Sequence, residues 1–162
     1  MTDRDDRQPD DRTEPTRNSL PKAYRDLDFL NSADARPLRI LSEHLGPDAR
    51  FEDHRINDTI VFFGSARLQP RDVAVKAMEA ARGHGGPLEI AKAERDLAMS
   101  RYYEQARELA FRLTEWSKGL EGTRRRFVVC TGGGPGVMEA ANRGASEARG
   151  IYIGLNMSLP LE

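Results

Sequence analysis

A run of glycines after an apolar segment is the part of this sequence whose residue types point to chemistry. Residues 126–130 predict a buried strand, and Thr131 leads from it into Gly132-Gly133-Gly134-Pro135-Gly136. Glycines let a backbone turn tightly and bring its N–H groups close to an anion. The free amides and the dipole of the helix that follows also favour negative charge. The order strand, glycine loop, helix therefore predicts a phosphate site.

Two common phosphate-binding loops do not fit the details of this one. A dinucleotide fingerprint reads G-x-G-x-x-G/A and is followed by an acidic residue at the end of the next strand. Gly132 and Gly134 fit, but Val137 occupies the third glycine position and the next predicted strand ends in Gly154-Leu155-Asn156. A P-loop needs Gly-Lys-Ser/Thr at the helix start, and no lysine lies nearby. A mononucleotide or a sugar phosphate remains as the expected ligand.

The predicted site also draws on the segment that follows the apolar run 58–63. Because the carboxyl ends of parallel strands meet at one edge of a sheet, this segment and the glycine loop are expected to face the same crevice. The hydroxyl of Ser65 either donates to a phosphate or ribose, or closes a local turn. The candidate nucleotide- or phosphate-binding residues are Gly64, Ser65, Arg67, Gly132, Gly133, Gly134, Gly136, Val137, Met138, Glu139 and Asn142.

Three polar members of this set also have ordinary structural explanations. Arg67 is a candidate phosphate clamp, but solvated arginines just past a strand are common. Glu139 falls in the first helical turn, where a carboxylate already favours the helix dipole, so it is not assigned as a general base. Asn142 lies one turn further on and contacts either a ligand or solvent. No catalytic residue is assigned from the sequence.

The remaining reactive side chains form no catalytic or metal-binding pattern. Cys130 lies on the apolar strand and is expected to behave as a small buried hydrophobe. His44, His54 and His84 lack the spacing of metal ligands, so neither a metal nor a cofactor is expected. Residues 124–126 are three consecutive arginines, interpreted as a solvated strand entry with nucleic-acid contact as the weaker alternative.

Composition restricts the function classes further. The chain has 162 residues, of which 38% are hydrophobic, enough for one ordinary domain with a core. With 25 basic and 26 acidic residues the net charge is −1, so no overall field attracts nucleic acid or a membrane. A single cysteine excludes an internal disulfide framework. No apolar run long enough to span a bilayer and no signal-peptide core are found, so a cytoplasmic location is expected.

The elements that position the glycine loop are expected to alternate between helix and strand. Strands are predicted at 58–63, 126–131 and 151–155, and helices at 22–29, 34–45, 70–82, 88–118 and 135–149. The second helix is expected to stop at Gly46-Pro47, and Pro135 is expected to open the last one. Gly150 is expected to end that last helix.

Apolar periodicity predicts which helix faces are buried. The predicted helix 88–118 is expected to bury a stripe with steps of three and four residues, which places Trp116 in the core. The last helix is expected to approach the sheet closely through small residues. The stripe comprises Ala98, Tyr102, Ala106, Leu109, Leu113, Trp116 and Leu120. The face of the last helix comprises Val137, Ala140, Ala141, Gly144, Ala145 and Ala148.

The sequence resembles the Lonely Guy family of Rossmann-like proteins over roughly residues 35–162. The resemblance implies a three-layer parallel α/β sheet with N-terminal packing helices, and nucleoside 5′-monophosphate phosphoribohydrolase activity on a ligand such as AMP. It also implies a homodimer. The segments that carry it are residues 62–67, 132–145 and 153–156, with Leu159-Pro160.

One family signature, Pro-Gly-Gly-x-Gly-Thr-x-x-Glu, and the arginine-containing helix before it are missing from the sequence. In the family these segments supply the catalytic glutamate and much of the phosphate cradle. The sheet is therefore expected to be truncated after its third strand. The resemblance then implies only the front half of the hydrolase. The alternatives are a non-catalytic nucleotide or cofactor carrier, and an inactive truncated gene product. The expected organisation is a disordered charged tail at 1–19, a helical extension at 20–55 and a partial nucleotide-binding domain at 56–162.

Overall fold

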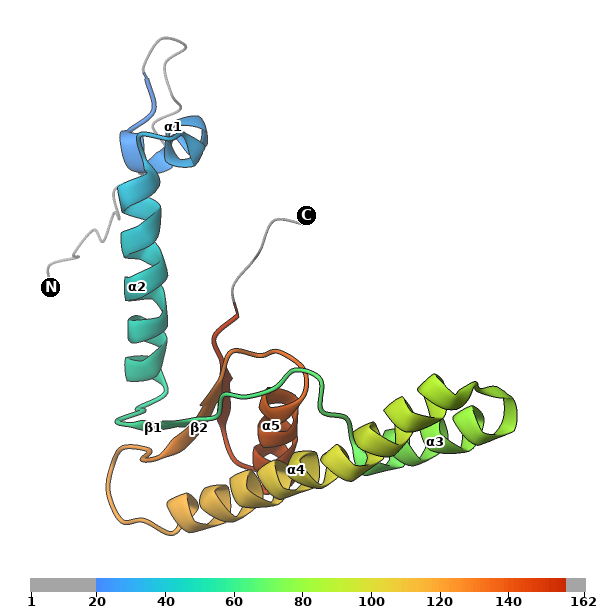
Figure 1. Ribbon diagram of the computed structural model, residues 1–162. Coiled ribbons are helices and arrows are strands. Elements are labelled where there is room, and N and C mark those ends of the chain that lie inside the picture. The colour runs from blue at the N-terminus through green and yellow to red at the C-terminus, as the bar shows by residue number, and fades with distance from the viewer. Residues whose placement is uncertain (1–19, 157–162) are drawn as a thin grey trace, which may run out of the picture. The chain divides into compact units, whose positions relative to one another are not determined.

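The computed structural model describes residues 20–156 (Figure 1). The chain divides into two compact units, Met1–Asp48 and Ala49–Glu162, and each is described by itself. The predicted tail 1–19 and the Leu159-Pro160 segment lie outside the described residues. The domain boundaries expected from the sequence stay predictions.

Short helices begin the described part of the chain. A 3-10 turn, η1 (Ala23–Arg25), precedes α1 (Leu27–Asn31), where a single helix over 22–29 was expected. The Asp26 carboxylate separates the two because it accepts a hydrogen bond from the Phe29 amide at 3.0 Å and so caps α1. Arg39 then donates to the carbonyls of Leu30 and Ser32, at 2.6 and 2.7 Å, and fixes the turn into the next helix.

Helix α2 (Arg36–Asp53) corrects the prediction that Gly46-Pro47 ends it. Proline fixes φ at a helical value, and the carbonyl that loses its partner belongs to Glu43, an exposed residue whose backbone is open to solvent. The helix ends instead where Arg55 takes a left-handed φ of 53°. The Ile56 amide then reaches back to the Phe51 carbonyl at 2.8 Å, which is the bond of a Schellman cap.

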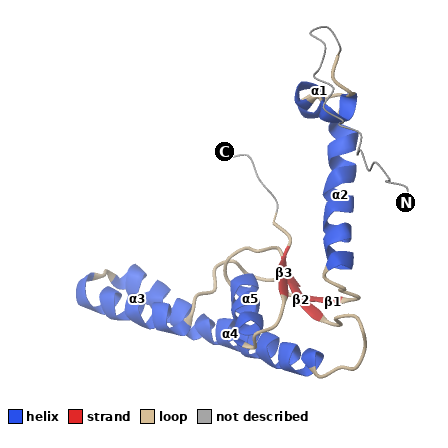
Figure 2. Ribbon diagram, turned by 180° about the vertical axis from the view of Figure 1, so that it is seen from behind, coloured by secondary structure: helices blue, strands red, loops and turns tan. Residues whose placement is uncertain are grey.

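A three-stranded parallel sheet of order β1-β2-β3 lies at the centre of the second unit (Figure 2). The strands are β1 (Thr59–Val61), β2 (Val128–Thr131) and β3 (Tyr152–Gly154), each shorter than predicted. Helices α3 (Arg71–His84) and α4 (Pro87–Lys118) connect β1 to β2, and α5 (Val137–Glu147) connects β2 to β3. This arrangement confirms the predicted Rossmann-like α/β class.

Close contact between α4 and α5 forms the core beside β2. Ala110, Val129, Ala141 and Ala145 are buried together, and Phe62 packs against them. A Cβ at Gly144 would collide with the Arg107 carbonyl and approach the Phe111 nitrogen at 3.0 Å. The small-residue face of α5 is therefore buried as predicted, but it approaches the backbone of α4 as well as the sheet.

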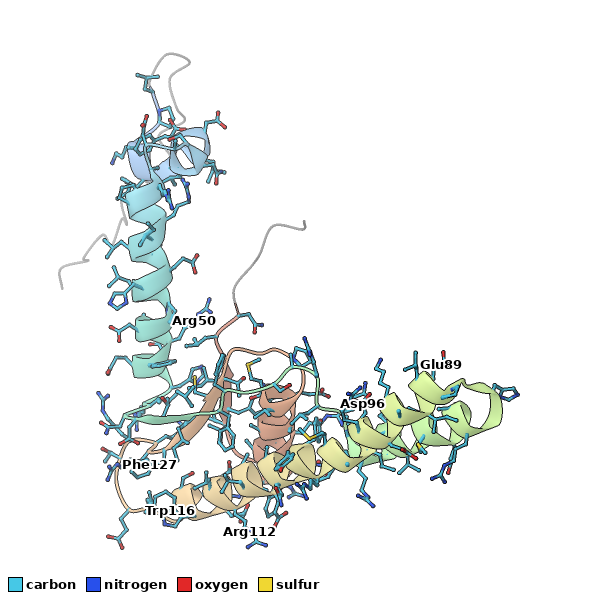
Figure 3. The ribbon with its side chains drawn as sticks, viewed as in Figure 1. Arg50, Glu89, Asp96, Arg112, Trp116 and Phe127 are labelled. Carbon is cyan, nitrogen blue, oxygen red and sulfur yellow. The ribbon has the colours of Figure 1, made fainter. Side chains whose placement is uncertain are left out.

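The buried face of α4 differs from the predicted apolar stripe. The stripe residues Tyr102, Leu109 and Trp116 remain 41%, 51% and 50% exposed. Close packing against α3 and α5 favours small or flat side chains on the buried face, so the larger apolar residues turn outward. Trp116 instead stacks on Phe127, with ring centroids 5.0 Å apart (Figure 3). The buried residues of α4 are Ala93, Ser100, Tyr103, Ala110 and Thr114.

Both ends of α5 also differ from expectation. The helix starts at Val137 rather than Pro135 because Gly136 has φ of 74°, outside the helical region. At the other end Arg149, not Gly150, takes the left-handed conformation, with φ of 52°. Glycine is still needed at 150, since a Cβ there would collide with the Thr114 side chain.

The turn that enters β2 is held by Asp58. Phe127 has a left-handed φ of 55°, and its amide donates to the Asp58 carboxylate. Arg126 also donates to this carboxylate, at 3.1 Å. The Phe127 hydrogen bond, with further help from the Arg126 charge, lowers the pKa of Asp58 below its ordinary value of 3.8.

Replacement of Gly144 by alanine tests the close approach of α4 and α5. Gly144→Ala is expected to lower the free energy of unfolding by about 1–3 kcal/mol because the added methyl group overpacks the helix contact. Gly83→Ala in α3 is the matched control, because nothing lies within 4 Å of a Cβ there. Alanine should stabilise that helix by about 0.5–1 kcal/mol. Urea unfolding measures both, and equal effects would contradict the packing described.

Acid unfolding tests the Asp58 contact. A lowered folded-state pKa means that Asp58 stabilises the fold above pH 3.8 and loses that effect as pH falls through the folded pKa. The stability difference between wild type and Asp58→Asn should thus be full near neutral pH and shrink below pH 3.8. Urea unfolding from pH 3 to 7 measures it, with Asp48→Asn as the charge-matched control. The same pH profile in both variants would be inconsistent with this role.

Candidate phosphate site

The two segments predicted to form the site lie against each other at the carboxyl edge of the sheet. The Val137 amide donates to the Ser65 carbonyl at 3.2 Å. A Cβ at Gly136 would collide with that same carbonyl, and one at Gly64 would lie 2.9 Å from the Val137 side chain. Because glycine has no side chain at either position, the loop after β1 can dock on the start of α5.

The three consecutive glycines have different reasons to be glycine. Gly133 has a left-handed φ of 72°, and a Cβ there would overlap the side chain of Asn156, just past β3. Gly132 and Gly134 lack a positive φ, and a Cβ at either would meet only the flexible Met138 side chain, at 3.3 and 2.6 Å. Gly133 is thus the position in this run where backbone geometry itself demands glycine.

Thr131, which was not among the predicted site residues, organises the loop. Thr131 is buried, with 2% of the residue exposed. Its hydroxyl accepts hydrogen bonds from the Gly133 amide and the Asn142 carboxamide, both at 3.0 Å. Asn142 is therefore tied to β2 as well as lining the site. A threonine two residues before a left-handed glycine at a strand end is the signal that sequence reasoning missed.

Unpaired backbone amides surround the start of α5. Within residues 20–156, the amides of Gly134, Gly136, Met138 and Glu139 donate to no protein acceptor. The N-cap residue, Gly136, has no side chain to satisfy them. Val137 is the exception because Ser65 accepts its hydrogen bond. Free N–H groups at a helix N-terminus are the donors that an anion site requires.

A pocket of about 420 Å³ is lined by two of these residues, Gly134 and Glu139, but not by Gly136 or Met138. Glu139 and Arg143 form an ion pair across one helical turn at 2.8 Å. The pair places a cation, which the sequence analysis missed, next to the one carboxylate that lines this pocket. The lining residues are Gly133, Gly134, Pro135, Glu139, Asn142, Arg143, Ser146 and Tyr152.

The loop after β1 contributes less direct chemistry. The Ser65 hydroxyl accepts a hydrogen bond from the Arg67 amide at 3.2 Å, which is the local turn considered as its alternative role. Its proton remains available for donation. The Arg67 side chain is exposed and does not line the pocket beside α5. Its contact with a phosphate stays a prediction.

Cys130 is buried on β2 directly before the loop. Burial raises the pKa of its thiol, which disfavours the thiolate needed for nucleophilic chemistry. The expected role of Cys130 as a packing residue is consistent with both observations.

Comparison with protein families bears on the same part of the chain. Residues 115–160 match the model of the SLOG cluster4 family. The matched segment contains β2, the glycine loop, α5 and β3, so the site described above falls within it. SLOG proteins are related to Lonely Guy-type Rossmann-like folds, and the match indicates a nucleotide-related domain without identifying a particular Lonely Guy protein.

Two further findings complete the comparison. A search of curated proteins found no match. Among residues 20–156, none of the helices combines the length and the apolar character needed to cross a membrane.

A substitution at Thr131 tests the hydrogen bonds that shape the loop. Thr131→Val leaves the Gly133 amide without its acceptor, so the free energy of unfolding should fall by about 1–3 kcal/mol. Amide exchange at Gly133 should also accelerate. Thr59→Val, on β1, keeps a β-branched side chain and should change stability by less than about 0.5 kcal/mol. Unchanged exchange at Gly133 in the Thr131 variant would show that the hydroxyl does not hold the loop.

Proposed function

We propose that this protein binds the phosphate of a mononucleotide at the glycine loop and the start of α5. The observation that carries the proposal is the group of unpaired amides at Gly134, Gly136, Met138 and Glu139. The helix dipole adds partial positive charge at the same place. The family match to this segment, with its nucleotide-related character, supports the assignment.

The side chains around the loop suit a nucleotide better than a bare phosphate. Arg143 lines the pocket and neutralises Glu139, so the carboxylate does not exclude a second anion. The Tyr152 ring, also on the pocket wall, offers an apolar surface to a ribose or base. A pocket volume of about 420 Å³ falls within the range of small-molecule sites. AMP is the proposed first ligand to test.

The resemblance to the Lonely Guy family supports a more specific second function, hydrolysis of the N-glycosidic bond of a nucleoside 5′-monophosphate. Such chemistry needs a carboxylate that assists attack at the anomeric carbon. Glu139 is the carboxylate on the wall of this pocket, and Arg143 pairs with it. The family segment that supplies the catalytic glutamate is missing from this sequence, which favours binding without catalysis. The homodimer implied by the resemblance remains a proposal as well.

Calorimetric titration with AMP tests binding at the loop. Gly133→Val places a side chain where φ is 72° and where Asn156 already lies, so the amides should be displaced. AMP affinity should fall by about tenfold or more, the effect of losing a hydrogen bond to a charged group. Cys130→Ala, which alters packing on the same strand, should leave affinity nearly unchanged. Equal affinity in wild type and a folded Gly133→Val variant would exclude this loop as the phosphate site.

An assay for released adenine separates the two functions. Wild-type protein incubated with AMP is expected to bind the nucleotide and release no free base, because the family segment that supplies the catalytic glutamate is missing from this sequence. Chromatography of the reaction mixture detects adenine directly. Sustained release that is abolished in Glu139→Gln would instead establish hydrolysis and make Glu139 its catalytic carboxylate.

A further inference from the structure

A second pocket, of about 480 Å³, lies at the end of the sheet opposite the glycine loop. Its wall includes Val128, the first residue of β2, whereas the glycine loop follows the last residue of that strand. No carboxylate is among its lining residues. The basic side chains on the wall are Arg55, Lys118, Arg124, Arg125, Arg126 and Arg149. This pocket is called the basic pocket below.

Three of these six basic side chains form ion pairs with carboxylates. Arg124 forms a two-point ion pair with Glu52, at 2.9 and 2.7 Å. Arg126 pairs with Asp58 as described above. Lys118 pairs with Glu115 at 2.5 Å and donates to the carbonyl of Ala148 near the end of α5. These contacts neutralise three of the six cations.

The other three cations have no carboxylate partner within residues 20–156: Arg55, Arg125 and Arg149. Backbone bonds bring two of them together, since the Arg125 amide donates to the Arg55 carbonyl at 2.7 Å. The Arg125 guanidinium donates to the carbonyl of His54, which leaves its charge uncompensated. Like charges on one pocket wall repel one another, and an anion bound among them would relieve that repulsion.

A buried hydroxyl on the same wall also lacks a partner. Thr114 on α4 lines the basic pocket and is only 4% exposed. Its Oγ1 makes no hydrogen bond with the described part of the chain. A buried hydroxyl without a partner costs free energy, and a helical threonine ordinarily donates to a carbonyl of the preceding turn. Because this oxygen is itself buried, the Thr114 side chain would have to rotate toward the pocket to meet an acceptor there.

We propose that the basic pocket binds a small phosphate-bearing molecule of two or more negative charges. Arg55, Arg125 and Arg149 would supply the charge, and Thr114 would donate a hydrogen bond to a phosphate oxygen. The volume accommodates a ligand up to the size of a nucleotide. Because the glycine loop lies at the other end of β2, this site is separate from the one proposed above and does not depend on it.

Titration of the full chain with pyrophosphate tests this site. Arg55→Asn and Arg149→Asn remove a charge while keeping a residue that tolerates the left-handed backbone at both positions. Each should weaken pyrophosphate binding by about tenfold, and Thr114→Val should do the same without lowering the melting temperature. Arg95→Gln, an exposed arginine of α4 outside the pocket, is the matched control and should bind as wild type does.

Comparison with the glycine-loop variant separates the two sites. Gly133→Val should retain pyrophosphate binding at the basic pocket even where AMP binding is lost. Three results would overturn the proposal: no pyrophosphate binding by the wild type, equal weakening in Arg95→Gln, or a loss caused by Gly133→Val but not by Arg149→Asn. Binding of a DNA oligonucleotide in the absence of any pyrophosphate binding would also overturn it, in favour of a nucleic-acid surface.

Discussion

The contact on which the candidate site depends is the docking of the Ser65 carbonyl against the start of α5. The carbonyl accepts the Val137 amide and occupies the space that a side chain at Gly136 would need. This one contact joins the loops that follow β1 and β2, which are separated by two helices in the chain. The neighbouring amides are left without acceptors, because within residues 20–156 Val137 alone among them has a protein acceptor. The site thus follows from a backbone approach that only glycine permits.

Small residues also permit a close backbone approach between α5 and α4. Gly144 and the alanines around it let α5 lie against the backbone of α4, which fixes the direction in which α5 leaves the glycine loop. Hydrogen bonds at Thr131 and Asp58 then set the turns at the two ends of β2. The glycine loop and the basic pocket occupy those two ends.

The sequence allowed two predictions: the parallel α/β fold, and a common crevice for the loop after β1 and the glycine loop after β2. Both predictions depend on local residue types. The failure of the prediction for α4 has a physical cause: large apolar residues marked one stripe, whereas packing against α3 and α5 buried the adjacent face that carries Ser100 and Tyr103. Helix ends were misplaced where a non-glycine residue, Arg55 or Arg149, adopts the left-handed conformation. Thr131 and Arg143 were missed although their partners Gly133 and Glu139 are only two and four residues away, spacings typical of a turn and of a helical ion pair. The contact of Thr131 with Asn142 depends on the folded chain.

The central claim is that free amides at the start of α5 hold a phosphate. Measuring the chemical shifts of the backbone amides by NMR tests this claim most directly. With ¹⁵N-labelled protein, saturating AMP should shift the resonances of Gly134, Gly136, Met138 and Glu139 most strongly. The Val137 resonance should move less, because the Ser65 carbonyl already accepts its hydrogen bond. Shifts confined to residues away from the glycine loop, or no shifts at an AMP concentration that calorimetry shows to be saturating, would contradict the claim.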